Sequence, residues 1–270
     1  MARKPNLEQT TKTALQQLIQ LAQDLKLTVI AQRLPQFLAE AETTSPSFTD
    51  FALSLLRAEA DSRIERRRNR NLKRSRLGKV QGIEDFDFAA RPQLDPRVVK
   101  ELLTCRFVLE RRNVLCLGRP GLGKTRIAKA VAHAACLAGY SVICVVASTM
   151  LEDIHSARAD GALFKRVLRR YTKPDLLLVD EFGYEAFTAQ ATDSLFRLVS
   201  ARHETGSIVL TANRGFSAWK KLFPTATAAA ATADRLVDGA TILRFSGKSF
   251  RQPREVIGAP LDERDDRDDS

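Results

Sequence analysis

A short segment with the residue spacing of a phosphate-binding loop runs from Gly118 to Thr125. Its sequence, GRPGLGKT, fits the pattern G-x-x-x-x-G-K-[ST]. Glycine backbones reach conformations closed to other residues, so several amide N–H groups can point at one anion. The lysine and hydroxyl residue that end the pattern reach the β/γ-phosphates and Mg²⁺. We therefore predict binding of ATP and Mg²⁺, with contacts from Gly118, Pro120, Gly121, Leu122, Gly123, Lys124, Thr125 and Arg126.

Two carboxylates, Asp180 and Glu181, follow a second apolar segment at residues 175–179. An aspartate at the end of a strand beside a phosphate-binding loop is typical of a Mg²⁺ site, so we assign the metal to Thr125 and Asp180. Glu181 could polarise the attacking water as general base. The alternative is a solvated acidic turn after a core strand. Together with Lys124, the pair favours hydrolysis by water over transfer to a small acceptor.

Two further polar residues could assist the same reaction. Asn213 follows an apolar run at 207–211 and could orient water against the γ-phosphate. Its alternative role is a turn-forming residue before Gly215. Arg235 could stabilise charge in the transition state, in its own active site or in that of a neighbouring subunit. Its alternative role is a surface ion pair.

Strands and helices must alternate around these residues. An apolar run at 113–117 precedes the loop, and an alanine-rich helix is predicted at 124–137, with its N-terminus facing the phosphates. Further strand-like runs lie at 141–147, 175–179, 207–211 and 241–245. This alternation predicts an α/β P-loop NTPase domain with a mostly parallel, five-stranded sheet covered on both faces.

The first part of the chain differs in pattern from the rest. Residues 6–78 carry almost no strand signal, and Leu15, Leu18 and Ile19 recur at helical spacing. Ser45 and Pro46 are interpreted as an N-cap followed by a proline at the first helical position. We therefore predict a small all-helical domain before the sheet.

A run of basic residues marks the end of this helical part. Its arginines fall on one face of a helix, and no residue between Ile64 and Leu72 is apolar, so we expect that stretch not to face a core. The chain carries a net charge of +11, for which a nucleic-acid partner is the leading explanation and an anionic membrane surface the second. The run itself is nearly all of one sign, which favours contact with a phosphate backbone over a purely solvated face. We predict contacts with the backbone of duplex DNA from Arg63, Arg66, Arg67, Arg70, Lys73 and Arg74, and from a second basic set that includes Arg166 and Arg169.

Composition argues against a membrane-spanning, secreted or cysteine-ligated metal protein. The 270 residues include no apolar run long enough to span a bilayer, and the first residues lack the apolar core of a signal peptide. The four cysteines have no metal-ligand spacing and lie in apolar segments, which predicts buried free thiols. We therefore expect a cytoplasmic protein with no membrane partner.

The chain resembles a known family over about Leu25 to Arg251. The resemblance is carried by the segments FALSLLRAE at 51–59, IEDFDF at 83–88, DEFGY at 180–184, TAN at 211–213, DRL at 234–236 and GKSFR at 247–251. These are similar to the IstB-like ATPases, helper proteins of bacterial insertion elements, which resemble DnaC-type helicase loaders within the AAA+ superfamily. The resemblance implies a homo-oligomer formed with ATP and DNA, remodelling of that DNA and its delivery to a transposase. It also implies that Asn213 is a sensor residue and Arg235 an inter-subunit arginine finger.

These observations combine into one hypothesis about organisation and function. We predict a helical DNA- or partner-binding domain at residues 1–80, an AAA+ ATPase domain at 81–258 and an acidic disordered tail at 259–270. The predicted catalytic residues are Lys124, Asp180, Glu181, Asn213 and Arg235. The leading function is an ATP-dependent transposition helper. The alternatives are a DnaC-like replicative helicase loader and an architectural DNA-binding protein with structural ATP.

Overall fold

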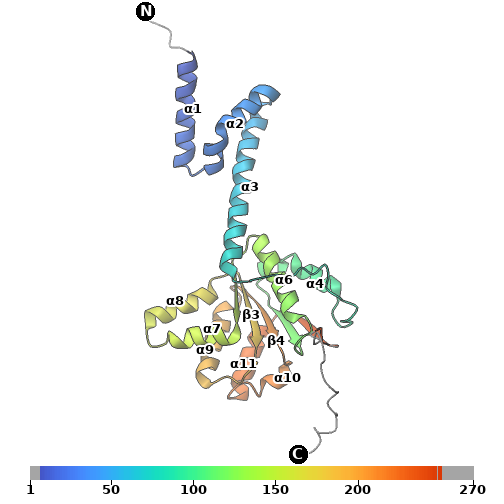
Figure 1. Cartoon of the computed structure of the whole chain (residues 1–270). Helices are drawn as coiled ribbons and strands as arrows, with labels where there is room; N and C mark the ends of the chain where they lie inside the picture. The colour runs from blue at the N-terminus through green and yellow to red at the C-terminus, as the bar shows by residue number, and fades with distance from the viewer. Residues whose placement is uncertain (1–6, 248, 251–270) are drawn as a thin grey trace, which may run out of the picture.

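A computed structural model of the chain describes residues 7–247, 249 and 250, and its centre is a parallel sheet (Figure 1). The strands lie in the order β2-β3-β4-β1-β5, and every neighbouring pair is parallel. Their bounds are β1 Val114–Gly118, β2 Val142–Val146, β3 Leu176–Phe182, β4 Ser207–Ala212 and β5 Thr241–Phe245. The predicted five-stranded parallel sheet is confirmed, and the phosphate-binding loop follows β1, which lies between β4 and β5.

Helices cover both faces of the sheet, as the continuous apolar strands predicted (Figure 1). Alternate residues of each strand enter two separate cores. Cys116, Leu178 and Val209 pack with α4 (Pro96–Leu103), α5 (Arg106–Leu109) and α6 (Lys124–Leu137). Leu115, Leu177 and Leu210 face the other core. That core is closed by α7 (Ala147–Ser156), α8 (Gly161–Thr172), α9 (Ala189–Arg202), α10 (Phe216–Trp219) and α11 (Ala226–Val237).

The four cysteines belong to these cores as free thiols, which confirms the prediction. Burial raises the pKa of the Cys105 and Cys136 thiols to about 11 and that of Cys116 to about 12. Their sulfur atoms therefore stay protonated at neutral pH. Within the part of the chain that the structure describes, no helix is long and apolar enough to cross a membrane.

Three helices precede the sheet domain: α1 (Leu7–Asp24), α2 (Thr28–Thr44) and α3 (Phe48–Ser75). A small core of Ala22, Ile30, Ala31 and Leu34 joins α1 to α2. The predicted start of the third helix at Ser45 is wrong. Ser45 ends α2 in a left-handed conformation, its N–H bonded to Ala41 O, whereas the Ser47 hydroxyl caps α3 by accepting from the Asp50 N–H. Pro46 therefore lies between two helices.

The long helix α3 runs from the N-terminal helices down to the sheet domain (Figure 1). Its basic residues between Ile64 and Leu72 are exposed, as predicted. The same stretch nevertheless contacts the domain. Arg68 Nε donates to Leu137 O at 2.7 Å, and Asn71 Nδ2 donates to Gly139 O and Tyr140 O. Carbonyls at the end of α6, such as Leu137 O, and in the residues just after it lack helical partners, so polar side chains can make this contact without an apolar residue.

Candidate active site

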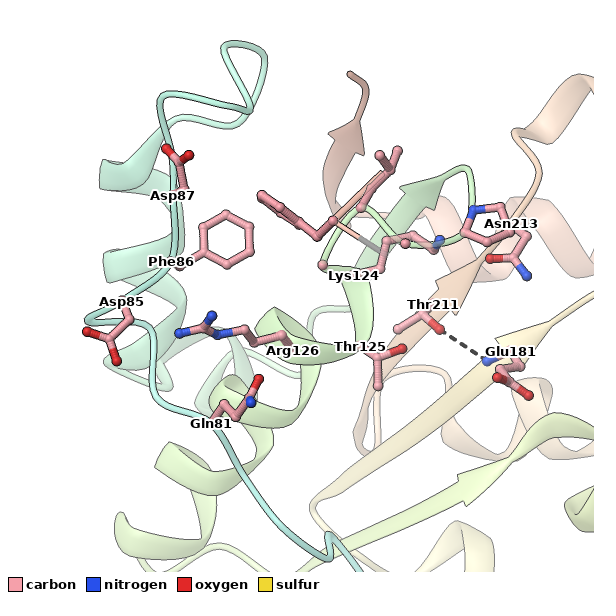
Figure 2. Close-up of a pocket in the computed structure, with 15 residues that line it drawn as sticks. Gln81, Asp85, Phe86, Asp87, Lys124, Thr125, Arg126, Glu181, Thr211 and Asn213 are labelled. Atoms are coloured by element: carbon pink, nitrogen blue, oxygen red, sulfur yellow. Dashed lines mark hydrogen bonds between the residues drawn. The ribbon is translucent and has the colours of Figure 1, made fainter. Parts of the chain in front are cut away.

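A cleft of about 590 Å³ opens beside the phosphate-binding loop, at the carboxyl ends of the strands (Figure 2). Figure 2 shows Lys124, Thr125, Glu181, Thr211 and Asn213 on one side of it, and Gln81, Asp85, Asp87 and Arg126 on the other. The carboxyl ends of parallel strands, where loops meet, are the usual ligand site of such sheets. The lining residues are Gln81, Asp85, Phe86, Asp87, Pro120, Gly121, Leu122, Gly123, Lys124, Thr125, Arg126, Glu181, Thr211, Asn213 and Phe250.

The loop is shaped by its glycines and by the start of α6. Gly123 has a φ of 93°, and a Cβ there would come within 2.6 Å of the Phe86 ring, so no larger residue fits. Lys124 begins α6, which turns the free N–H groups of the first helical turn towards the cleft. The Lys124 ammonium donates to Arg119 O at 2.7 Å. Backbone dipoles and one cation therefore converge on the same space.

Gly118 differs from the other predicted loop contacts. It is the last residue of β1, and it does not line the cleft. A Cβ at this position would lie 2.3 Å from Phe245 O on β5. The absence of a side chain at Gly118 therefore allows β1 and β5 to approach closely. Pro120, Gly121, Leu122, Gly123, Lys124, Thr125 and Arg126 all line the cleft.

The two predicted acids are brought to the loop by β3. Thr125 Oγ1 donates to Asp180 Oδ1 at 2.9 Å, which joins the loop to the strand. The Thr211 hydroxyl on β4 donates to the same Asp180 oxygen. Glu181 follows at an irregularity in the β3–β4 pairing between Val179 and Phe182, with a φ of 59°. Its side chain is exposed and lines the cleft.

The residues at this junction suit Mg²⁺. A hydroxyl and a carboxylate are both oxygen ligands, the kind that this ion prefers. Neighbouring ligands of an octahedral Mg²⁺ with bonds of 2.0–2.1 Å lie about 2.9 Å apart. Thr125 Oγ1 and Asp180 Oδ1 have that separation, 2.9 Å. Among the described residues, no three His, Cys, Asp or Glu side chains form a metal site, so phosphate and water oxygens would complete the set.

The far side of the cleft was not predicted from the sequence. It is made by residues 81–87, before the sheet, and by Phe250 after it. The Phe250 N–H donates to Gly121 O at 2.8 Å, and its ring lies 3.9 Å from the buried Arg91 guanidinium. Arg91 Nε in turn donates to Leu122 O at 3.1 Å. The two ends of the domain thus meet on the loop.

The sequence held a signal for these missed residues. Aromatic and acidic residues alternate in the run IEDFDF at 83–88, one of the segments that carry the family resemblance. Phe86 is buried against the loop, and Arg126 donates two hydrogen bonds to Gly82 O. Arg126 therefore joins the loop helix to this segment as well as lining the cleft.

Arg235 lies far from the cleft of its own chain. The Asn113 side chain, directly before β1, donates to Leu236 O at 3.2 Å, so the end of α11 lies at the amino edge of the sheet. The five residues of β1 separate that edge from the loop, a span of about 16 Å. The Arg235 guanidinium lies over the Phe196 ring at 4.6 Å. The structure does not bring Arg235 together with the other predicted catalytic residues.

Some of the predicted DNA-contacting residues meet in a second cavity. We call this cavity of about 650 Å³ the basic groove; its walls are α3, the start of β2 and α8. Its cationic residues are Arg74, Lys165, Arg166, Arg169, Arg170 and Lys173. Arg170 has an acidic partner, Asp153, at 3.4 Å. Two sets of basic residues that are distant in sequence therefore face one space.

Other basic residues of α3 have partners within the chain. Arg63 Nε and Arg66 Nη2 bond to the buried Glu59 carboxylate at 3.0 and 3.3 Å. Arg66 Nη1 also donates to Thr28 Oγ1. Burial acts to raise the pKa of Glu59, but hydrogen bonds from the Val29 N–H and the Arg63 side chain hold it below its usual range. Arg67, Arg70, Lys73 and Arg74 are exposed on the same helix.

Comparison with known proteins identifies the family. A model described as IstB-like ATP binding protein matches residues 20–256. A protein of insertion sequence IS5376 from Geobacillus stearothermophilus, named for expected ATP binding, is 34% identical over 84% of this chain and 90% of its own. Its counterpart in insertion sequence IS21 from Pseudomonas aeruginosa is 33% identical over 84% and 85% of the two chains. A crystal structure of DnaI, at 18% identity, matches 63% of this chain and 92% of its own with a TM-score of 0.50, which supports the fold alone. The chain therefore belongs to the IstB-like family of ATP-binding proteins of insertion sequences, as its motifs predicted.

Proposed function

We propose that this protein hydrolyses ATP to ADP and phosphate and uses the reaction to control its assembly on duplex DNA as a transposition helper. The observation that carries the proposal is the bond from Thr125 Oγ1 to Asp180 Oδ1, 2.9 Å long. It joins the phosphate-binding loop to the acidic end of β3, and Lys124 and Glu181 line the same cleft. P-loop NTPases use these parts to position a triphosphate and activate water.

Each residue has a defined part in the proposed reaction. Thr125 and Asp180 would hold Mg²⁺, which when bound neutralises charge on the β- and γ-phosphates. Lys124 and the N–H groups of the first turn of α6 bind phosphate oxygens. Glu181 accepts a proton from water as the water oxygen attacks the γ-phosphorus, and the bond from that phosphorus to the β–γ bridging oxygen breaks. Asn213 orients the water.

Arg235 fits this reaction from a neighbouring subunit. It lies at the amino edge of the sheet, whereas the cleft is at the carboxyl edge. A head-to-tail homo-oligomer would bring the amino edge of one copy to the cleft of the next. There the guanidinium would stabilise the charge on the transferred phosphoryl group.

The DNA partner is supported by the distribution of positive charge. The basic groove combines Arg74 of α3 with Arg166 and Arg169 of α8. Arg67, Arg70 and Lys73 extend this charge along the exposed part of α3. Arg63 and Arg66, which bond to Glu59, would contribute less to DNA binding. Such contacts recognise the phosphate backbone rather than base sequence. The transposase partner is proposed from the insertion-sequence relatives.

The hydrolytic part is tested with Glu181→Gln. We expect phosphate release to fall about 100- to 10,000-fold, the usual contribution of a general base, while ATP binding is retained. Glu185→Gln is the matched control, because Glu185 is exposed in the segment that follows β3 but does not line the cleft. Normal turnover by Glu181→Gln would contradict the base assignment. A wild-type protein that releases no phosphate with saturating duplex DNA would instead favour structural ATP, and a complex with a replicative helicase without DNA affinity would favour a loader.

A further inference from the structure

Thr211 was not among the predicted catalytic residues, yet it contacts both acids of the cleft. It is on β4, next to the last residue of the strand, and its side chain is almost fully buried. Its hydroxyl donates to Asp180 Oδ1. Thr211 Oγ1 also accepts a hydrogen bond from the Glu181 N–H at 3.1 Å (Figure 2). One side chain on a neighbouring strand therefore joins the proposed metal ligand to the proposed base.

The chemistry of a hydroxyl suits this double contact. It has one hydrogen to donate and lone pairs to accept with, so it can serve a carboxylate and an amide at once. Asp180 Oδ1 also accepts from the Thr125 hydroxyl. Two donors on one oxygen hold the carboxylate in one orientation towards the loop.

The contact to Glu181 acts through the backbone. Glu181 has a φ of 59°, a left-handed conformation that non-glycine residues rarely adopt. The bond to Thr211 Oγ1 fixes the direction of the Glu181 peptide N–H. That peptide in turn sets where the side chain leaves the strand. Without the hydroxyl, the peptide could rotate and carry the Glu181 carboxylate away from the cleft.

We propose that Thr211 is a positioning residue for ATP hydrolysis, which orients Asp180 through its carboxylate and Glu181 through its backbone. This inference rests on the proposed function of the cleft. It assigns Thr211 no contact with ATP and no transfer of a proton to or from water. Its effect is therefore expected in kcat and in the dependence on Mg²⁺, with little change in ATP binding.

The test compares Thr211→Ser with Thr211→Ala, which differ from each other in the hydroxyl alone. Thr211→Val, which keeps the branched shape, is the third variant. Steady-state kinetics would give kcat and the half-saturating Mg²⁺ concentration, and a fluorescent ATP analogue would give nucleotide affinity. The control is Thr192→Val. Thr192 is also buried, but its hydroxyl donates to the carbonyl of Thr188, the N-cap of α9, away from the cleft.

Loss of a residue that orients catalytic and metal-binding groups typically lowers activity or metal affinity about 10- to 100-fold. We expect such a loss of kcat in Thr211→Ala and Thr211→Val, a higher Mg²⁺ requirement and nearly unchanged nucleotide affinity. Thr211→Ser and Thr192→Val should stay near wild type. Equal kcat in the alanine and serine variants would overturn the inference, whether both are active or both inactive. An inactive wild-type protein would contradict the proposed function itself.

Discussion

The basic groove makes a quantitative prediction about salt. Among the described residues, five of its six cations have no ion pair: Arg74, Lys165, Arg166, Arg169 and Lys173. We assume that each of these residues contacts one DNA phosphate. The logarithm of the DNA association constant then falls by about 4.5 for each tenfold increase in salt concentration, since each contact contributes about 0.9. Between 50 and 200 mM salt, this slope corresponds to about a 500-fold loss of affinity.

The perturbation is the double variant Arg166→Ala, Arg169→Ala. With two of the five contacts removed, the slope should become shallower by about 1.8, and the loss over the same salt range should shrink to about 40-fold. Contacts elsewhere on α3 would add to both slopes and leave their difference unchanged. The predicted quantity is therefore the difference in salt slope between the wild type and the variant. This difference can be predicted without knowing every DNA contact.

The assay is fluorescence anisotropy of a labelled duplex, titrated at several salt concentrations with a non-hydrolysable ATP analogue. The control is Arg97→Ala, Arg106→Ala, which removes the same charge from exposed residues paired with Asp95 and Glu110. We expect the control slope to match wild type. Equal slopes for wild type and the groove variant would refute the assignment of the groove to phosphate.

Three further predictions concern the loop, the N-terminal helices and one buried phenol. Lys124→Ala should weaken ATP binding about 10- to 100-fold, as expected for loss of a charged hydrogen bond worth about 1.5–3 kcal/mol, and calorimetry would measure it. Because the pKa of Glu59 is lowered in the fold, its stabilisation is present above its unfolded pKa and is lost as pH falls through the folded value. Urea unfolding of Glu59→Gln between pH 3 and 7 should therefore show a weaker acid dependence than wild type, and an identical dependence would contradict this. Burial and the bond to Asp153 raise the pKa of Tyr171 to about 12. Its contribution of about 3 kcal/mol to the free energy of unfolding is therefore present below pH 10 and is lost as pH rises through 12. Absorbance at 295 nm should show a late tyrosine titration in wild type that is absent from Tyr171→Phe.

The sheet and the loop could be predicted because their signals are local. An apolar run such as 113–117, followed by glycines and a helix, indicates a strand, a phosphate-binding loop and the direction of both. The residue order also placed Asp180 beside Thr125, because Asp180 lies near the end of β3, Thr125 follows β1, and the carboxyl ends of parallel strands meet at one edge. These predictions needed no knowledge of distant contacts.

The missed features depend on contacts between distant segments. The bonds from Arg63 and Arg66 to Glu59 combine with a bond from the Val29 N–H, so the role of Glu59 became visible only once α2 lay against α3. Phe250 reaches the cleft because β5 pairs with β1, a neighbour far away in sequence. Helix boundaries failed for a different reason: Ser45 and Ser47 are both suitable caps, and backbone conformation decides between them.

Helix α3 is continuous, so a tilt at its lower end displaces its upper end. Its 28 residues span about 42 Å, and its lower end is bonded to the end of α6 through Arg68 and Asn71. The joint lies about 30–35 Å from the upper end at Phe48, so a tilt of about 10° there would move that end by about 5–6 Å. The opposite end of α6 carries Lys124 and Thr125. A tilt of α6 that carried this contact with it would therefore move the N-terminal helices farther than it moves the contact itself.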